Sequence, residues 1–237
     1  MKLLFGCMCI LTLCFIQCTH SNIPTHTNTY CNPVSISYRF CLDTPTRREA
    51  ADPTVVRYKN KYYLFASKSG GYWEGTDLQS WKFIPCSTLP IEDYAPTAIV
   101  IGDTLYFMAS SHTKNAIYKT TQPETGKWHI ACDSIEIPMW DPAFFLDDDN
   151  SLYIYWGCSN QNPIYGAKMD YTNNFKLIAP PKVLVHAKPN EHGWEVPGDN
   201  NTLYNQNPWI EGAWVNKYNG KYYLQYSGPG TEFKSYC

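Results

Sequence analysis

Short apolar runs recur in pairs along this chain, and a polar turn separates the two runs of each pair. The second runs are rich in aromatic residues and occupy residues 61–67, 104–110, 151–157 and 221–227. A related apolar phrase precedes each of them, at residues 51–56, 94–100, 139–146 and 210–215. Runs of this length, separated by polar turns, predict β-hairpins rather than helices.

The pairs form an internal repeat of roughly 40–50 residues with about four short strands each, which indicates a β-propeller. We expect outer strands at 72–76 and 81–84 in blade one, at 116–120 and 128–130 in blade two, and at 164–169 in blade three. Blade one then ends near residue 85, and blade two spans about residues 94–130. No segment predicts a helix, so the predicted fold class is all-β.

The fourth repeat contains two strands before the sequence stops at Cys237. Three blades and half of a fourth would leave an apolar sheet edge uncovered, because a propeller must close on itself. We therefore expect this chain to be a fragment with an incomplete propeller domain at residues 47–237. Made alone, it should be poorly soluble or inactive.

Two polar segments lie between the predicted strands. The long segment between Pro180 and Pro208 contains Trp194 and Glu195, and long loops in compact domains are usually functional. The acidic segment 147–150 is interpreted as a hairpin turn rather than an ion site, because Asp and Asn are common turn residues.

Composition narrows the possible partners. The net charge of −2 gives no broad cationic surface, so nucleic acid is not an expected partner. The aromatic share of 16% is high, and we expect most of these rings to pack between blades.

The N-terminus resembles a bacterial lipoprotein signal, with a charge at Lys2, an apolar stretch from residue 3 to 16, and Cys18 as the lipidated residue. We expect a signal peptide at residues 1–17 and a polar tether at 18–46. The protein would then be exported to the bacterial periplasm or held at the outer-membrane surface, touching the membrane only through its lipid. Phe15 and Gln17 depart from the preferred signal, so ordinary cleavage or a membrane anchor remain alternatives.

Six cysteines follow Cys18, at positions 31, 41, 86, 132, 158 and 237. Six cysteines allow fifteen pairings, and the spacing does not distinguish disulfides from free thiols. No cysteine or histidine cluster has metal-ligand spacing, so no metal or other cofactor is expected from this pattern.

Three of the four blade openings carry an acid, namely Asp52, Asp141 and Glu211, whereas blade two opens with Ala95. The first strands of a propeller line its central channel, so these carboxyl groups should converge at one mouth. Glycosidic bond hydrolysis requires two carboxyl groups across a cleft, one protonated and one ionised. Apolar neighbours suit Glu211 to the acid, and Arg47 and Arg48 favour an ionised Asp52.

These openings resemble the catalytic trio of glycoside hydrolase family 43, from about residue 49 to the end of the chain. The resemblance implies a five-bladed propeller that hydrolyses arabinofuranosides, xylosides or galactosides with inversion. It implies Asp52 as general base, Glu211 as general acid, and Asp141 as the residue that tunes the proton affinity of that acid and orients it. Ala213 stands where many members have proline, and the fifth blade, which supplies further active-site and calcium-binding residues in the family, is absent.

Aromatic rings beside the acids should bind the terminal sugar of an oligosaccharide or polysaccharide. Adjacency to the channel-side segments selects Trp73, Trp140 and Trp209, each of which could instead pack between blades.

Three alternatives remain. The related fructoside-cleaving propellers open with Asn-Asp-Pro, and Ala51 stands at the asparagine position here. A non-catalytic sugar-binding propeller would use the same acids to bind hydroxyl groups. An inactive fragment is the third.

Overall fold

The computed structural model describes residues 36, 50–90, 94–111, 115–135 and 139–237. The expected signal peptide, the lipidation site Cys18 and nearly all of the tether lie outside these residues. Among the described residues, none forms an α-helix, and no helix has the length and apolarity needed to span a bilayer. Two short 3-10 turns, η1 (Pro123–Thr125) and η2 (Gly193–Glu195), interrupt the strands.

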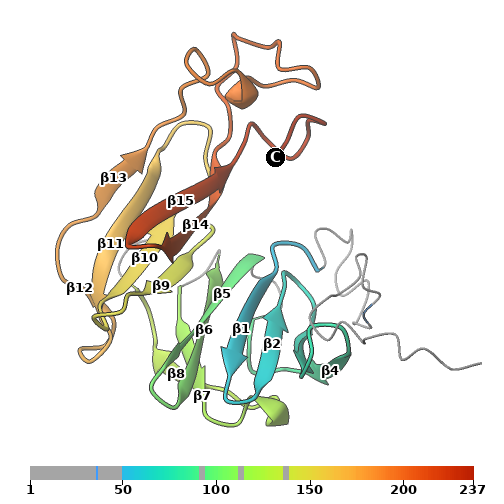
Figure 1. The fold of residues 1–237 in the computed structure, drawn as a ribbon, viewed down its shortest axis with the longest axis vertical. Helices are drawn as coiled ribbons and strands as arrows, with labels where there is room; N and C mark the ends of the chain where they lie inside the picture. The colour runs from blue at the N-terminus through green and yellow to red at the C-terminus, as the bar shows by residue number, and fades with distance from the viewer. Residues whose placement is uncertain (1–35, 37–49, 91–93, 112–114, 136–138) are drawn as a thin grey trace, which may run out of the picture. The chain divides into compact units, whose positions relative to one another are not determined.

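The first two blades are four-stranded antiparallel sheets in which consecutive strands are neighbours (Figure 1). Blade one comprises β1 (Thr54–Tyr58), β2 (Lys61–Phe65), β3 (Gly71–Gly75) and β4 (Trp81–Pro85). Blade two comprises β5 (Tyr94–Ile101), β6 (Thr104–Ser110), β7 (Ile117–Thr120) and β8 (His129–Cys132). The predicted propeller blades are therefore confirmed, with small shifts at the strand ends.

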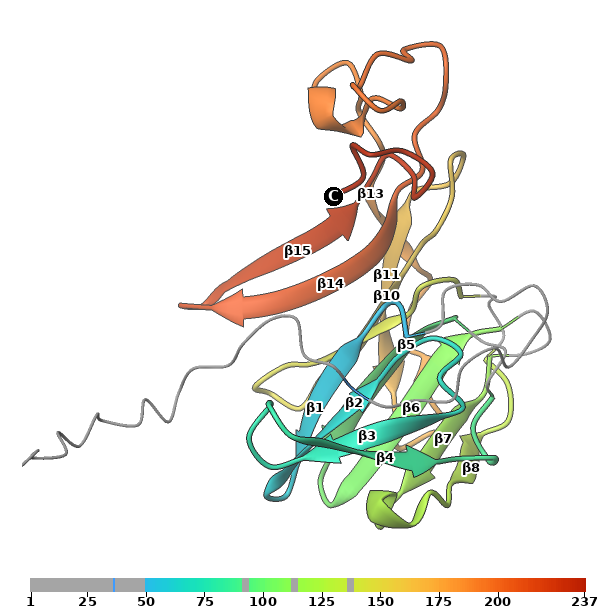
Figure 2. The same ribbon diagram turned by 90° about the vertical axis from the view of Figure 1, so that its right-hand side faces the viewer.

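Blade three is more complex than the sequence pattern predicts. It comprises β9 (Ala143–Leu146), β10 (Leu152–Trp156), β11 (Ile164–Asp170), β12 (Lys176–Leu177) and β13 (Lys182–Val185), and both of the last two pair with β11. Blade four is the hairpin of β14 (Glu211–Tyr218) and β15 (Lys221–Ser227), which Figure 2 shows clearly. The described residues thus form three full blades and two strands of a fourth, as predicted.

The first strands of successive blades are neighbours: β1 contacts β5, β5 contacts β9, and β9 contacts β14. The residues that open these strands therefore lie close together, although their sequence positions are far apart. This arrangement positions the candidate site.

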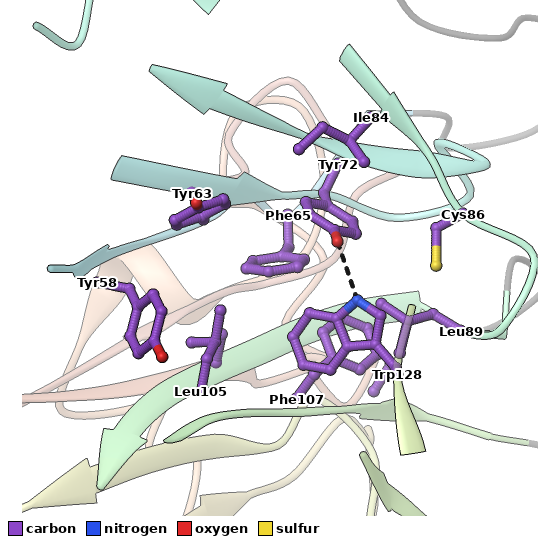
Figure 3. Packing of buried hydrophobic residues seen from close by; sticks show 12 residues of the cluster. Tyr58, Tyr63, Phe65, Tyr72, Ile84, Cys86, Leu89, Leu105, Phe107 and Trp128 are labelled. Carbon is purple, nitrogen blue, oxygen red and sulfur yellow. Dashed lines mark hydrogen bonds between the residues drawn. The ribbon is translucent and has the colours of Figure 1, made fainter. Parts of the chain in front are cut away.

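Aromatic side chains fill the space between blades one and two (Figure 3). Phe65 packs at 4.9 Å from Tyr72 and 5.4 Å from Phe107, measured between ring centroids. Trp128 donates its indole N–H to the Tyr72 hydroxyl at 3.1 Å, and that hydroxyl donates to the Pro123 carbonyl. The rings fill the space between the two blades, and the buried N–H and O–H groups of Trp128 and Tyr72 are hydrogen-bonded. These aromatic residues therefore stabilise the packing of the blades.

The acidic segment 147–150 forms a turn, and the described cysteines form no disulfide. The Asn150 amide donates to the Asp147 carbonyl at 2.9 Å, so residues 147–150 form the predicted hairpin turn. Cysteines at 86, 132, 158 and 237 are free thiols, while Cys31 and Cys41 lie outside the described residues.

Candidate active site

A backbone kink opens each blade. The opening residues Asp52, Ala95 and Asp141 have φ values of 51°, 48° and 52°, and each precedes a proline. Aspartate tolerates this left-handed conformation better than most residues, because its short side chain can bond locally. The kink in blade four is at Gly212, with φ of 66°.

The position of the fourth kink corrects the sequence alignment. Gly212, rather than Glu211, is the structural equivalent of Asp52 and Asp141. Glycine adopts positive φ at little cost, so it replaces the aspartate at this position. The acid of blade four therefore lies one residue earlier than the repeat predicts.

Serine hydroxyl groups connect neighbouring kinks. Ser67, at the end of blade one's second strand, accepts a hydrogen bond from the Ala95 amide at 2.9 Å and donates to Asp52 Oδ2 at 2.8 Å. Ser110 likewise accepts from the Asp141 amide at 2.8 Å. The expected base, Asp52, is thus held by a fully buried serine.

In blade three, Gly157 directly follows the second strand, β10, where the first two blades have Ser67 and Ser110. Without a serine hydroxyl there, the Gly212 amide donates to Asp141 Oδ2 at 3.2 Å. A carboxylate thus contacts the opening of blade four, and this contact brings Asp141 beside the segment that carries Glu211.

The kinks surround a cleft of about 260 Å³. Asp52 and Asp141 both line it, together with Trp214 from β14 and Tyr236 from the segment after β15. The remaining lining residues are Pro53, Thr54, Ala95, Pro96, Pro142, Ala143, Gly212, Ala213 and Ser227.

Glu211 is only 5% exposed, and both of its carboxyl oxygens have partners. Tyr236 donates its hydroxyl to Oε1 at 2.8 Å, and the Cys158 thiol donates to Oε2 at 3.0 Å. Carboxylate oxygens of Asp141 and Glu211 and the Cys158 sulfur lie within 4.8 Å of one another. The structure therefore brings Asp141 and Glu211 together, as expected from the sequence.

Tyr236 keeps its proton in this environment. Burial raises the pKa of the phenol above its ordinary value, and the hydrogen bond to Glu211 and the charges of Glu211 and Asp52 raise it further. The hydroxyl is therefore a permanent donor at any ordinary pH.

The donor atoms of Asp141, Cys158 and Glu211 do not suit a calcium ion. Calcium takes six to eight oxygen ligands, whereas Asp141, Cys158 and Glu211 offer one sulfur among few oxygens. This cluster is accordingly better described as a hydrogen-bonded acid group than as a calcium site.

The aromatic candidates differ in accessibility. Trp73 has no exposed surface and packs at 5.4 Å from Phe83 within blade one, so it cannot stack on a sugar, and that prediction is wrong. Trp140 and Trp209 are each 37% exposed, and neither is among the residues that line the cleft. Trp214 lines it instead.

Sequence reasoning missed Trp214, Tyr236, Cys158 and Ser67. Alignment on the kink would have found Trp214, which follows Gly212 by two residues, as Thr54 follows Asp52. Tyr236 and Cys158 contact Glu211 from segments with no repeat signal, so no sequence pattern indicates them.

The segment between blades three and four is anchored by a buried acid. Glu195 in η2 is fully buried, and its carboxylate accepts hydrogen bonds from the Lys188 amide and, at 2.5 Å, from the Tyr226 hydroxyl. Trp194 packs at 5.3 Å from the Tyr226 ring. These contacts give Glu195 a structural role in fixing the segment to β15.

Comparison with known proteins places these observations in a family. Residues 44–237 match the family model "Glycosyl hydrolases family 43". A curated relative, a β-xylosidase of Xylanibacter ruminicola, is 26% identical over 126 residues, which covers 41% of this chain and 35% of that protein.

Solved structures resemble the fold. A thermostable family-43 glycoside hydrolase has a TM-score of 0.65 at 23% identity, covering 88% of this chain and 70% of that chain. An endo-1,4-β-xylanase of Bacteroides thetaiotaomicron has a TM-score of 0.61 at 25% identity, covering 80% and 67% respectively. This chain therefore spans only part of its relatives.

Proposed function

This chain belongs to the glycosyl hydrolases of family 43, and we propose that the complete protein removes a terminal sugar from a plant-type polysaccharide with inversion of configuration. The sugar would be a xylosyl, arabinofuranosyl or galactosyl residue. The observation that carries the proposal is that Asp52 and Asp141 line one cleft and that a carboxylate oxygen of Glu211 lies within 4.8 Å of one of Asp141.

Asp52 is the proposed general base. It faces the cleft, and the Ser67 hydroxyl donates to one of its oxygens. A hydrogen bond to the ionised form favours that form, so the carboxylate can accept a proton from water. The other oxygen of Asp52 would orient the attacking water toward the anomeric carbon.

Glu211 is the proposed general acid. It is buried, and a carboxylate oxygen of Asp141 lies within 4.8 Å of one of its own. Asp141 also accepts a hydrogen bond from the Gly212 amide, so it fixes the backbone beside the acid. Both contacts support Asp141 as the residue that tunes and orients Glu211.

An inverting displacement requires room for water between base and acid. We expect the carboxyl groups of Asp52 and Glu211 to be separated by roughly 6.5–9.5 Å, against about 5–5.5 Å for a retaining pair. Water loses a proton to Asp52 while its oxygen attacks the anomeric carbon, and Glu211 protonates the departing oxygen.

The size of the cleft supports action at a chain end. Its volume of about 260 Å³ lies just below the roughly 300–1,000 Å³ of most ligand pockets, which suits one sugar ring. The similarity to a β-xylosidase makes xylose the first sugar to test. Trp214, Trp140 and Trp209 are the aromatic residues proposed to contact the substrate.

A panel of aryl xylosides, arabinofuranosides and galactosides tests the proposal on the complete protein. Proton NMR of the first product should show the anomeric configuration opposite to that of the substrate. Glu211→Gln should lose turnover of natural substrates but keep that of substrates with a good leaving group, which need little protonation. Asp52→Asn should be inactive on both.

Two results would contradict this assignment. One is near-normal activity of Asp52→Asn on both substrate types, and the other is retained configuration in the product. Asp141→Asn provides a further check, because it should alter the pH–rate profile of the reaction. Sugar binding without any turnover would instead favour a carbohydrate-binding propeller.

A further inference from the structure

We propose that the two oxygens of Glu211 have separate tasks, with Oε1 held by Tyr236 and Oε2, beside Cys158, carrying the proton that reaches the leaving group. This inference rests on the proposed function and deepens it. Tyr236 and Cys158 are then positioning residues, since they act through Glu211.

The contact at Oε1 is a strong and fixed one. Tyr236 donates to it at 2.8 Å, and the phenol cannot lose its proton in the working range because burial and Glu211 raise its pKa. Mutual hydrogen bonds between Cys237 and Gly228, at 3.0 and 3.2 Å, hold the segment that carries Tyr236 against the end of β15. A proton on Oε1 would weaken this hydrogen bond, because a protonated oxygen is a poorer acceptor than a carboxylate oxygen.

The contact at Oε2 is weaker and can be exchanged. A thiol is a weak donor and a weak acceptor, so turning the S–H bond of Cys158 leaves Oε2 free to hold a proton at small cost. Cys158 stays opposite Glu211 because Ser159 and Ile210 exchange backbone hydrogen bonds at 3.2 and 3.1 Å.

The proton on Glu211 Oε2 passes to the glycosidic oxygen as the bond to the anomeric carbon breaks. Water supplies the hydroxyl group to that carbon and its second proton to Asp52. Cys158 then donates to the carboxylate oxygen that has just been uncovered, and exchange of one proton from Asp52 to Glu211 through solvent restores the starting state.

Tyr236→Phe and Cys158→Ala test the assignment in the complete protein. Tyr236→Phe should lower kcat/KM on a natural oligosaccharide about ten- to hundredfold, because a displaced acid protonates poorly. The loss on a dinitrophenyl glycoside should be about threefold or less, since that leaving group needs little protonation. Cys158→Ala should cost about fivefold or less on either substrate, because its donor is weak.

Tyr226→Phe is the matched control. It also removes a tyrosine-to-glutamate hydrogen bond, but that bond goes to the structural Glu195. We expect this variant to lose stability without changing the ratio of activities on the two substrates. If Tyr236→Phe keeps its oligosaccharide activity while Cys158→Ala loses it, the two oxygens have been assigned in the wrong order.

A titration that needs no turnover separates this inference from the proposed function. Carbon-13 NMR of labelled glutamate follows the Glu211 carboxyl group, whose signal is assigned by its loss in Glu211→Gln. The titration midpoint should move to higher pH in Tyr236→Phe, because the ionised form loses a donor, and should not move in Tyr226→Phe. An unmoved midpoint in Tyr236→Phe overturns the inference, whereas a moved midpoint in a protein that cleaves no substrate overturns the proposed function.

Discussion

Replacing Ser67 by alanine removes one hydroxyl group that serves two blades. The fully buried hydroxyl accepts the Ala95 amide and donates to Asp52. Alanine leaves that amide without its acceptor in a nearly dry site, which costs about 1–3 kcal/mol of folding free energy. It also removes a donor from the ionised base.

The same change should affect catalysis in a recognisable way. A misoriented base lowers kcat/KM by about tenfold, equivalent to about 1.4 kcal/mol, on activated and natural substrates alike, because both need the attacking water. The acid limb of the pH–rate profile should move toward higher pH, since the ionised form has lost a hydrogen bond. Urea unfolding measures the stability, and kcat/KM across pH measures the rest.

Thr97→Val is the control for this prediction. The Thr97 hydroxyl accepts the Phe144 amide at 3.0 Å between blades two and three, so valine leaves another buried amide without a partner. We expect a similar loss of stability and an unmoved acid limb. An unchanged urea midpoint in Ser67→Ala, or an equal shift of the acid limb in Thr97→Val, would refute the reasoning.

Three other changes have defined outcomes. Trp73→Ala should cost about 3–5 kcal/mol of stability in urea unfolding with an unchanged KM, because this ring fills the core and touches no substrate. Lys217, which bonds Asp147 at 2.5 Å, lowers the pKa of that carboxyl group to about 2, with help from Tyr222. That stabilisation is fully present above about pH 5 and is lost as pH falls through 2, so the difference in urea midpoint between wild type and Lys217→Met should be clear at pH 6 and much smaller near pH 2. Mass spectrometry of the N-terminal peptide from the exported protein should show lipid on Cys18, and an unmodified, uncleaved Cys18 would remove the proposed anchor.

The blades could be predicted from sequence because each hairpin has a local signal. Alternating apolar residues and polar turns indicate which segments form paired strands. The repeat of roughly 40–50 residues indicates how many blades the chain contains. The extra strand β13 escaped prediction because it pairs with β11 across an intervening turn and strand, and nothing local distinguishes its four residues from a loop.

The candidate site was only partly predictable. Asp52 and Asp141 follow the repeat, but a sequence repeat does not give backbone angles. Only Ala213, at the position of the prolines, indicated that Gly212 rather than Glu211 takes the kink. Trp73 was misassigned because adjacency in sequence does not specify the face of a strand. The partners of Glu211 come from distant segments, and only the folded chain brings them together.

The kink at Ala95 has a consequence for how such a protein can change. Its backbone has nearly the same φ as those at Asp52 and Asp141, yet its side chain is a methyl group that lines the same cleft. The scaffold therefore provides a cleft position whose backbone conformation matches that of the two aspartates, but the alanine there carries no reactive group. A single codon change there could add a carboxylate to the cleft without rebuilding any strand, so new reactivity in such a fold can arise by filling vacant positions rather than by inventing geometry.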